Sequence, residues 1–242
     1  MLQRKNVDIN IQEKSVLKNI SLDFEKGKNY CILGKNGSGK SSLALTTMGH
    51  PSYEIKQWDI LIEGKSIKDI SPDERAKLWI FLAFQSIPEI KWVKLFEFLR
   101  SIYSAKIGEN QTFIKFKKHI VPLLDELQIN HEFLRRDLNV WFSGGERRKI
   151  EILQLKLLEP TYIFLDEVDS WLDVDAFKSV AELIKSLNTP DNTFIIITHY
   201  FSILDYIPID VVYVLEKGQL IKTGLQDIAD KVRDEWFSWL EE

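Results

Sequence analysis

The chain has few of the residues that mark secreted or membrane proteins. It contains one cysteine, Cys31, among 242 residues, so no internal disulfide can form, and we expect a cytoplasmic setting, or the plastid stroma for an organellar protein. It has no run of about 18 consecutive apolar residues, the length that a membrane-spanning helix needs. The stretch from Met1 to Lys5 leads into polar alternation and lacks the apolar block of a signal peptide. We therefore expect no direct membrane insertion.

An excess of positive charge is also lacking. The formal net charge is −4 and the pI is about 5.7, which gives no electrostatic reason to expect a nucleic-acid partner. One basic cluster, Lys115, Lys117, Lys118 and His119, is interleaved with phenylalanines. A solvated helix face explains that pattern better than a nucleic-acid surface does.

The beginning of the chain predicts a mostly antiparallel sheet. Between residues 2 and 24, apolar residues recur at partly alternating positions, which is typical of strands with one buried face. Another strand is expected from Asp59 to Glu63. A helix should then begin at Ser71 or Pro72, because Ser71 and Glu74 have the spacing of a capping box.

The middle of the chain predicts a helical insertion over about 86–158. Residues Trp92 to Tyr103 and Phe113 to Leu127 carry apolar residues at helical spacings, which favours amphipathic helices. Because proline has no backbone N–H, Pro122 is expected to kink or restart the second helix.

Continuous apolar runs mark the last third. Tyr162–Leu165 and Phe194–Ile197 predict parallel strands covered on both faces, joined by a helix from Val174 to Leu187. A hairpin over 211–223 and a helix over 226–240 should follow. The predicted fold class is α/β, a single domain over residues 1–242. In it, about 1–85 and 159–242 form a parallel core sheet with an antiparallel β subdomain, and about 86–158 form an inserted helical subdomain.

A glycine-rich stretch after the predicted strand Tyr30–Leu33 carries the strongest sign of a ligand. It comprises Gly34, Lys35, Asn36, Gly37, Ser38, Gly39, Lys40, Ser41 and Ser42, and it matches G-x-x-x-x-G-K-[ST] at every fixed position. In this pattern, backbone N–H groups at a helix N-terminus converge on phosphate. We expect Lys40 to reach the β and γ phosphates and the Ser41 hydroxyl to bind Mg²⁺. The alternative, a plain turn with a surface lysine, fits the ordered strand, loop and helix less well.

Polar residues follow three of the predicted strands. Asp166 and Glu167 come after Tyr162–Leu165, His199 follows Phe194–Ile197, and Gln85 ends a strand at 80–84. Ligands of open parallel sheets bind beyond the carboxyl ends of the strands. We expect Ser41 to bind Mg²⁺ and Asp166 to hold it through water, while Gln85 is placed to touch either Mg²⁺ or the attacking water. Glu167 should polarise the attacking water, and His199 should contact the γ phosphate.

A further candidate site lies at the start of a predicted helix that ends near Leu158. Ser143, Gly144, Gly145 and Glu146 have the spacing of a capping box, which is a sufficient structural reason for Ser143 and Glu146. Two glycines in the first turn of a helix are costly, however, at about 1 kcal/mol each relative to alanine. We interpret them as a place where the backbone closely approaches an anion.

Six stretches in this order resemble the motifs of ABC ATPases. Gly34–Ser41 is similar to Walker A, Gln85 to the Q-loop, Ser143–Glu146 to the signature, Ile163–Glu167 to Walker B, Leu172-Asp173 to the D-loop and His199 to the H-loop. The resemblance implies a P-loop NTPase of ABC type that hydrolyses ATP with Mg²⁺. It also implies an ATP-dependent head-to-tail dimer with a second copy, in which each ATP lies between one chain's phosphate loop and the other chain's Ser143 helix.

Within the ABC ATPases, the chain resembles the SufC family, the ATPases of the SUF iron–sulfur cluster assembly system. The stretches that carry this are Gly49–Glu54, Phe81–Gln85, Phe142–Glu146, Glu151–Gln154, Leu165–Ser170 and Ile197–Tyr200. Trp171 departs from the pattern, since glycine usually precedes Leu-Asp there, and so does Ser86–Val93. The resemblance implies a SufB or SufB/SufD-like scaffold protein as partner, and the scaffold must hold the cluster because one cysteine cannot supply the four ligands usually needed. The ATPase subunit of an ABC membrane transporter and a slow, nucleotide-gated binding module are the alternatives.

Overall fold

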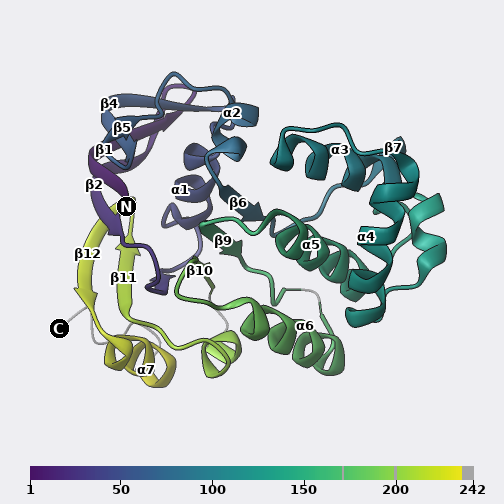
Figure 1. The fold of residues 1–242 in the computed structure, drawn as a ribbon. Coiled ribbons are helices and arrows are strands. Elements are labelled where there is room, and N and C mark those ends of the chain that lie inside the picture. Colours follow the sequence, from purple (N-terminus) through teal and green to yellow (C-terminus); the bar gives the residue numbers. More distant parts are fainter. Residues whose placement is uncertain (171, 199–200, 236–242) are drawn as a thin grey trace. The chain divides into compact units, whose positions relative to one another are not determined.

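Contacts between residues group the chain into two units, which are described separately here. The structure is a computed structural model that describes residues 1–170, 172–198 and 201–235 (Figure 1). The first unit comprises Met1–Phe84, Pro160–Val168 and Asn188–Glu242, and the second comprises Gln85–Glu159 and Asp169–Leu187.

A six-stranded sheet forms the centre of the first unit. Its order is β12-β11-β3-β10-β9-β6, with bounds β3 Tyr30–Leu33, β6 Ile80–Ala83, β9 Tyr162–Asp166, β10 Thr193–Ile197, β11 Val211–Glu216 and β12 Gln219–Gly224. Every neighbouring pair is parallel except β11 and β12, which form the predicted hairpin. All residues of β3, β9 and β10 are buried. The prediction of parallel strands covered on both faces is therefore confirmed.

The predicted antiparallel sheet is present in the same unit. Its order is β2-β1-β4-β5, with bounds β1 Leu2–Ile11, β2 Lys14–Phe24, β4 Tyr53–Ile62 and β5 Lys65–Ser66. Strand β4 is longer than predicted because its whole length pairs with β1. Aromatic rings join this sheet to the core sheet: Phe24 lies edge-on to Tyr30, with ring centroids 4.9 Å apart, and to Phe164, at 6.1 Å.

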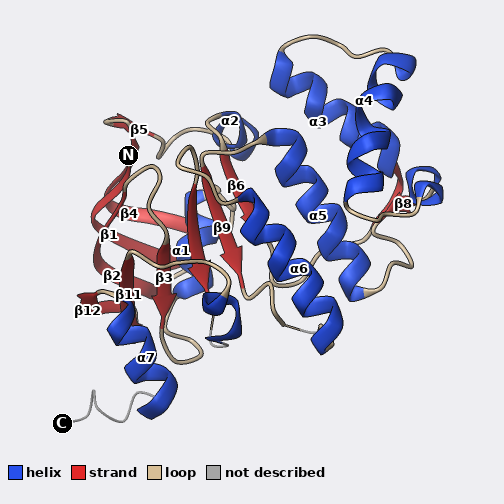
Figure 2. Ribbon diagram, turned by 60° about the horizontal axis from the view of Figure 1, so that its bottom comes forward, coloured by secondary structure: helices blue, strands red, loops and turns tan. Residues whose placement is uncertain are grey.

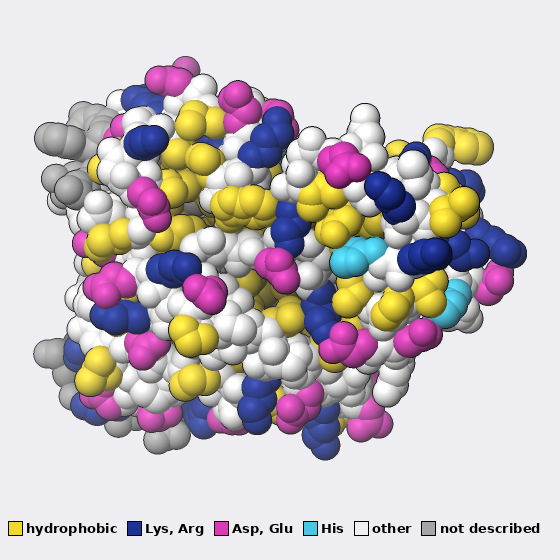
Figure 3. Space-filling view, in the orientation of Figure 1, with side chains coloured by type: hydrophobic (Ala, Val, Ile, Leu, Met, Phe, Trp, Pro, Cys, Tyr) yellow, Lys and Arg dark blue, Asp and Glu magenta, His cyan; other side chains and the backbone are white. Residues whose placement is uncertain are grey.

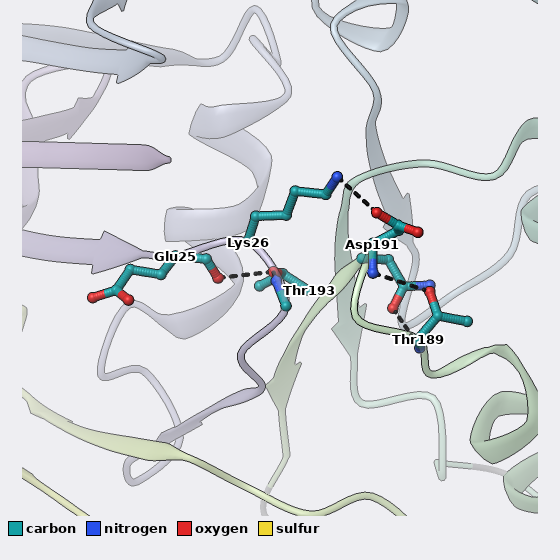
Figure 4. Close-up of polar contacts among 7 residues, drawn as sticks. Glu25, Lys26, Thr189, Asp191 and Thr193 are labelled. Atoms are coloured by element: carbon teal, nitrogen blue, oxygen red, sulfur yellow. Dashed lines mark hydrogen bonds and ion pairs between the residues drawn. The ribbon is translucent and has the colours of Figure 1, made fainter.

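The turn before β3 is fastened to the loop before β10 (Figure 4). Thr193 accepts a hydrogen bond from the backbone N–H of Gly27 and donates one to the carbonyl of Glu25, both at 2.9 Å. Lys26 forms an ion pair with Asp191 at 3.0 Å. These contacts fix where β3 begins, and β3 leads directly into the glycine-rich loop.

Four helical segments complete the described part of the first unit. They are α1 Lys40–Thr47, α2 Pro72–Lys77, the 3₁₀ segment η2 Phe201–Asp205 and α7 Gln226–Glu235. Helix α1 packs on β2 and β4 of the antiparallel sheet and on β9 of the core sheet. The capping box predicted at Ser71 and Glu74 opens α2. The predicted continuation of α7 to residue 240 lies outside the described residues.

The second unit is mainly helical (Figure 2). Its elements are β7 Ile90–Lys94, α3 Leu95–Ile107, α4 Phe113–Glu126, η1 His131–Arg135, β8 Asp137–Leu138, α5 Gly144–Leu158 and α6 Val174–Leu187. The prediction of a helix beginning at Trp92 is wrong, since α3 begins at Leu95 and Trp92 lies in β7. A distant partner explains this, because the backbone N–H of Trp92 donates to the carboxylate of Asp137, the first residue of the strand β8 that pairs with β7. Helix α4 runs through Pro122 without restarting.

The surface carries charges of both signs. On the face seen in Figure 3, basic and acidic side chains are interspersed, which agrees with the small net charge of the sequence. Within the described ranges, no helix combines the length and the apolar character that crossing a membrane requires.

Candidate active site

The glycine-rich loop has the backbone of a phosphate cradle. Gly37 and Gly39 adopt left-handed φ angles of 79° and 102°, and α1 begins directly after Gly39. A Cβ atom at Gly39 would lie 2.3 Å from a methyl carbon of Leu17, whereas a Cβ atom at Gly37 would meet no atom within 4 Å. Gly39 is therefore favoured by its left-handed φ together with the close approach of Leu17, and Gly37 lies at the open side of the loop, where a ligand can approach the backbone.

Ser41 joins this loop to the end of β9. Its hydroxyl donates a hydrogen bond to Oδ1 of Asp166 at 3.0 Å. Asp166 is 4% exposed and Glu167 is 6% exposed. The backbone N–H of Glu167 donates to the carbonyl of Ile197 at 2.8 Å, and Glu167 has a left-handed φ of 47°. The hydroxyl and the carboxylate that were predicted to bind Mg²⁺ therefore lie together at the carboxyl end of β9.

Lys40 is buried inside the loop that it follows. Its ammonium group donates to the carbonyls of Gly34, at 2.7 Å, and Lys35, at 3.3 Å. Burial lowers the pKa of Lys40, and the nearby charges of Glu167 and Asp166 act in the opposite direction. These two hydrogen bonds hold the charge of Lys40 within the glycine-rich loop.

A buried guanidinium group, that of Arg4, holds the other end of α1. Its Nη2 donates to the carbonyl of Leu43 at 3.1 Å and to the hydroxyl of Thr47. The guanidinium group also lies 5.4 Å from the ring centroid of Phe24 and 5.5 Å from that of Phe164. Arg4 has no exposed surface, and burial lowers its pKa to about 9.

Arg75 contacts the same end of α1 from α2. Its Nη1 donates to the carbonyls of Thr46 and Thr47 at 2.8 and 3.0 Å, while Nε and Nη2 bind the carbonyls of Ile70 and Lys68. A Cβ atom at Gly49 would lie 2.9 Å from Nε, so Gly49 leaves room for this group. Positive charge at the last carbonyls of a helix complements its dipole. The two arginines fix the helix whose first residues are Lys40 and Ser41.

The tip of the β11–β12 hairpin supports the loop from a third side. The backbone N–H of Gly218 donates to the carbonyl of Ser38 at 3.2 Å, and the carbonyl of Gly218 accepts from the N–H of Lys18 at 2.8 Å. Gly218 has a φ of 80°, and a Cβ atom there would lie 2.2 Å from the carbonyl oxygen of Val16. Only glycine fits this place without moving either the hairpin or the loop.

In the second unit, Ser143 caps α5 as predicted. Its hydroxyl accepts a hydrogen bond from the N–H of Glu146 at 3.2 Å, and the carboxylate of Glu146 accepts from the N–H of Ser143 at 2.7 Å. A Cβ atom at Gly145 would lie 3.3 Å from the Cβ of Ala176 on α6. Close packing therefore gives a structural reason for Gly145, one of the two glycines that the sequence analysis interpreted as a place of close approach to an anion.

Two consecutive arginines of α5 hold the segment that begins at Gln85. Arg148 is 4% exposed, pairs with Glu151 at 2.7 Å and donates to the carbonyl of Gln85 at 3.1 Å. Arg147 donates to the carbonyl of Phe142 at 2.9 Å and forms an ion pair with Glu89. A pocket of about 300 Å³ lies here, lined by Gln85, Ser86, Ile87, Gly144, Arg147, Arg148, Ser170 and Leu172.

The predicted site residues are divided between the two units. Lys40, Ser41, Asp166 and Glu167 share the first unit, around the loop from Gly34 to Ser42. Gln85 and the stretch Ser143–Glu146 share the second unit, where Arg148 connects α5 to Gln85. His199, together with Trp171, lies outside the described residues.

The side chains of the first unit fit a nucleotide and Mg²⁺. The Ser38 hydroxyl is buried in the loop and has no hydrogen-bond partner among the described residues, so an acceptor is missing where the loop would hold phosphate. The Ser41 hydroxyl and the Asp166 carboxylate are oxygen ligands of the kind that Mg²⁺ prefers. Across the described ranges, no cluster of three or more His, Cys, Asp or Glu side chains could hold another metal ion.

Four positioning residues were missed by the sequence analysis. Arg4, Arg75, Arg148 and Gly218 act through contacts with residues far away in the chain. Glu151 gives a weak local sign of Arg148, since a buried carboxylate three residues along a helix needs a cation. For Arg4, a basic residue inside an alternating strand was the only available sign.

Comparisons with known proteins identify the family. A family model described as ABC transporter matches residues 17–170. A probable ATP-dependent transporter from Antithamnion sp., ycf16, is 43% identical over 99% of this chain and 97% of its own length. One from Synechocystis sp., slr0075, is 40% identical over 100% and 96%. Vegetative protein 296 from Bacillus subtilis is 37% identical over 98% and 92%.

Solved structures give the same answer for the fold. The ATP-binding cassette MJ0796, solved as a dimer in a post-hydrolysis state with ADP and Pi, aligns with a TM-score of 0.78 at 21% identity and covers 93% of this chain and 98% of its own. An ATP-binding subunit of an ABC transporter aligns at 0.80 and 22% over the whole of both chains. This chain belongs to the ABC transporter family, as an ATP-hydrolysing domain with the P-loop NTPase fold of ABC cassettes.

Proposed function

We propose that this chain is the ATPase subunit that drives conformational change in a SufB or SufB/SufD-like scaffold during iron–sulfur cluster assembly. The observation that carries the proposal is the set of SufC-like stretches on either side of the nucleotide site, above all Leu165–Ser170, which continues from the strand that ends in Asp166. The chain has one cysteine, which is buried, so it cannot supply the ligands of a cluster. This supports a scaffold that holds the cluster and an ATPase that changes the scaffold's conformation.

Binding of ATP begins with the first unit. The backbone N–H groups that open α1 receive the β and γ phosphates, and Lys40 moves from the carbonyls of Gly34 and Lys35 to the phosphate oxygens. Ser41 and Asp166, already joined by a hydrogen bond, would hold Mg²⁺, and Gln85 would contact either the ion or the attacking water. The chemistry that Mg²⁺ would supply when bound is neutralisation of the charge that develops on the phosphate oxygens.

Hydrolysis then requires an oriented water molecule. Glu167 follows Asp166 at the end of β9, and its carboxylate takes the role of polarising that water. His199 contacts the γ phosphate, and Gln85 links the site to the segment that Arg148 and Arg147 hold. A partner protein that binds this segment would then be able to move both Gln85 and the start of α5.

A second copy of the chain completes the site. The N-terminus of α5, with Ser143, Gly144, Gly145 and Glu146, takes the γ phosphate bound by the loop of the other copy, because helix N-termini attract anions. MJ0796, a cassette of the same fold, is a dimer in its structure with ADP and Pi. A head-to-tail, ATP-dependent dimer is therefore part of the proposal.

The proposed location is the cytoplasm, or the plastid stroma for an organellar protein. A relative named ABC transporter I family member 6, chloroplastic, from Arabidopsis thaliana, is 38% identical over 93% of this chain. The second candidate function is the ATPase subunit of a membrane transporter, and it is favoured by the names of the Antithamnion and Synechocystis relatives, both called probable ATP-dependent transporters.

Purification of the tagged chain from its native source separates the two functions. One half of the cells is lysed without detergent, and the membranes of the other half are dissolved in detergent. A scaffold protein recovered with the chain from the detergent-free fraction is the expected result. An integral membrane protein recovered with it from the membranes, and no scaffold from the other fraction, would overturn the proposal in favour of the transporter.

A further inference from the structure

Three tryptophans in the described part of the chain have a backbone conformation that suits glycine. Trp79, Trp92 and Trp141 have φ angles of 63°, 68° and 61°. The left-handed region crowds any side chain against the backbone, and a bulky residue there is a genuine outlier. Glycine enters this region at no steric cost.

The chemistry of the other left-handed residues makes these three stand out. Among the described residues, the remaining non-glycine members of this set are Gln12, Asn19, Glu63, Gln128, Asn139, Glu159, Glu167 and Lys217, all of which are polar. The chain has 14 phenylalanines and 7 tyrosines, and no described one belongs to the set. The left-handed conformation is thus associated with tryptophan alone among the aromatic residues.

Each of the three positions is of a type that commonly takes glycine, and the three types differ. Trp79 follows Leu78, the residue that caps the C-terminus of α2, and its N–H bonds back to Ala76 at 3.1 Å, so it occupies the place where helices most often end in a left-handed glycine. Trp92 lies where the pairing of β7 with β8 shifts register between Ile90 and Lys94, as at a bulge with a left-handed glycine. Trp141 lies in the turn before α5.

Two of these three side chains are not packed against the rest of the protein. Trp92 is 91% exposed and Trp141 is 88% exposed, whereas Trp79 is 39% exposed. Two indole rings therefore stand almost wholly in solvent on strained backbone, where they gain little burial to offset the strain. Exposure of this kind is expected when a residue has been exchanged without regard to its surroundings.

The composition deviates in the matching direction. The sequence contains 11 glycines and 7 tryptophans, whereas an average chain of this length would contain about 17 glycines. The shortfall of about six glycines is close to the number of tryptophans. The composition is therefore short of glycine, and tryptophan occupies three backbone positions that suit glycine.

We propose that positions 79, 92 and 141 are glycine in the protein as its source makes it. Tryptophan at these positions is then the product of reading a reassigned triplet with the wrong genetic code. The triplet UGA, a stop signal in the standard code, is read as tryptophan in some genetic codes and as glycine in others, so one misassignment exchanges the two residues at scattered places.

Restoring glycine also changes the surface near the proposed dimer contact, an aspect that rests on the proposed function. Trp141 lies two residues before Ser143, the N-cap of α5, and glycine there removes an exposed ring beside the helix N-terminus that would receive the other copy's phosphate. The evidence for glycine at these positions does not depend on the proposed function, because it comes from the backbone angles and the composition.

Mass spectrometry of the protein purified from its source tests the proposal directly. Trypsin releases the peptides Leu78–Lys91 and Asp137–Arg147, each with one of the positions. Each peptide should be lighter than the printed sequence implies by an indolylmethyl group less one hydrogen. Tryptophan in both peptides, or the universal tryptophan triplet UGG at all three positions of the gene, would overturn the proposal.

Thermal unfolding of recombinant variants provides a second test that does not depend on the source. Trp92→Gly and Trp141→Gly should each raise Tm by about 2–4 °C, because relief of strain outweighs the added freedom of the unfolded chain. Phe113→Gly is the matched control, since Phe113 is exposed but lies in the right-handed backbone of α4, and it should lower Tm. A fall in Tm for both tryptophan variants would contradict the assignment.

Discussion

The hydroxyl of Ser41 lies 3.0 Å from the carboxylate of Asp166, although the two residues are 125 positions apart in the sequence. This contact joins the start of α1 to the end of β9, so the phosphate loop and the strand that carries the acidic residues form one site. Glu167 comes next in the chain and is nearly as buried as Asp166. The roles of these two carboxylates can be separated by substitution.

Glu167→Gln should keep ATP binding and slow hydrolysis by about 10² or more, the usual scale for loss of a positioned general base. The amide retains the size of the side chain, so the hydrogen bond from the Glu167 N–H to Ile197 should survive. Single-turnover hydrolysis and equilibrium binding measure the two effects, and light scattering should detect an accumulated ATP-bound dimer. Asp166→Asn, the control, should instead weaken the Mg²⁺ dependence of binding. Wild-type turnover in Glu167→Gln would remove Glu167 from the mechanism.

The affinity for ATP should fall at alkaline pH earlier than an ordinary lysine would dictate. Burial lowers the pKa of Lys40 below 10.5, and only the protonated ammonium attracts phosphate. As pH rises through this lowered pKa, Lys40 loses its proton and ATP binding weakens. Calorimetric titrations across the alkaline range give the midpoint, with Lys40→Ala as a control that should bind weakly and without this dependence. An unchanged wild-type affinity up to pH 10.5 would contradict the assignment.

The same pKa shift has an opposite consequence for stability without ligand. Between the lowered pKa of Lys40 and 10.5, the unfolded chain binds more protons than the folded one. The contribution of Lys40 to the free energy of unfolding therefore rises with pH across that window. Binding and stability should thus respond to alkaline pH in opposite directions, which separates the titration of Lys40 from general unfolding.

The sequence was sufficient wherever a few neighbouring residues determine the structure. The capping boxes of Ser71 with Glu74 and of Ser143 with Glu146 are formed as predicted, because both partners lie in one helical turn. The buried strands β9 and β10 were equally visible, since unbroken apolar runs require cover on both faces.

Predictions failed or were missing where the partner lies far along the chain. The predicted helix included residues 92–94, yet these residues belong to β7 because β8, which begins at Asp137, pairs with that strand. The hydrogen bond from Arg148 to the carbonyl of Gln85 joins residues 63 positions apart, and no local sequence pattern predicts it. For Arg4, the only sign in the sequence was a basic residue inside an alternating strand, and its contact with α1 becomes visible only in the folded structure.

Ser143→Arg should leave the isolated chain folded and able to bind ATP but should stop hydrolysis that depends on the dimer. A bulky cation at the N-cap would block the approach of the other copy's phosphate to α5. The lost cap itself costs about 1 kcal/mol, so Ser143→Ala is the control for stability, and it should hydrolyse ATP faster than Ser143→Arg.

Mixing Ser143→Arg with Lys40→Ala tests whether the sites are shared between copies. In a head-to-tail dimer of the two variants, one composite site carries both defects and the other carries neither. Each variant alone should be inactive, and the mixture should recover measurable turnover. If activity in the mixture stays at the level of the separate variants, the sites are not built from two chains.

Gly218→Ala should weaken ATP binding about tenfold or more, a loss of about 1.4 kcal/mol, although Gly218 lies in a hairpin far from the loop in sequence. The added Cβ would lie 2.2 Å from the carbonyl of Val16, so the hairpin tip must move and its hydrogen bond to Ser38 is lost. Gly64→Ala is a matched control: Gly64 has a φ of 78°, close to the 80° of Gly218, but a Cβ there meets no atom within 4 Å. Both variants bear the cost of a left-handed alanine, about 1 kcal/mol of stability, but only Gly218→Ala should lose affinity in calorimetric titration. Equal affinities would mean that the hairpin does not position the phosphate loop.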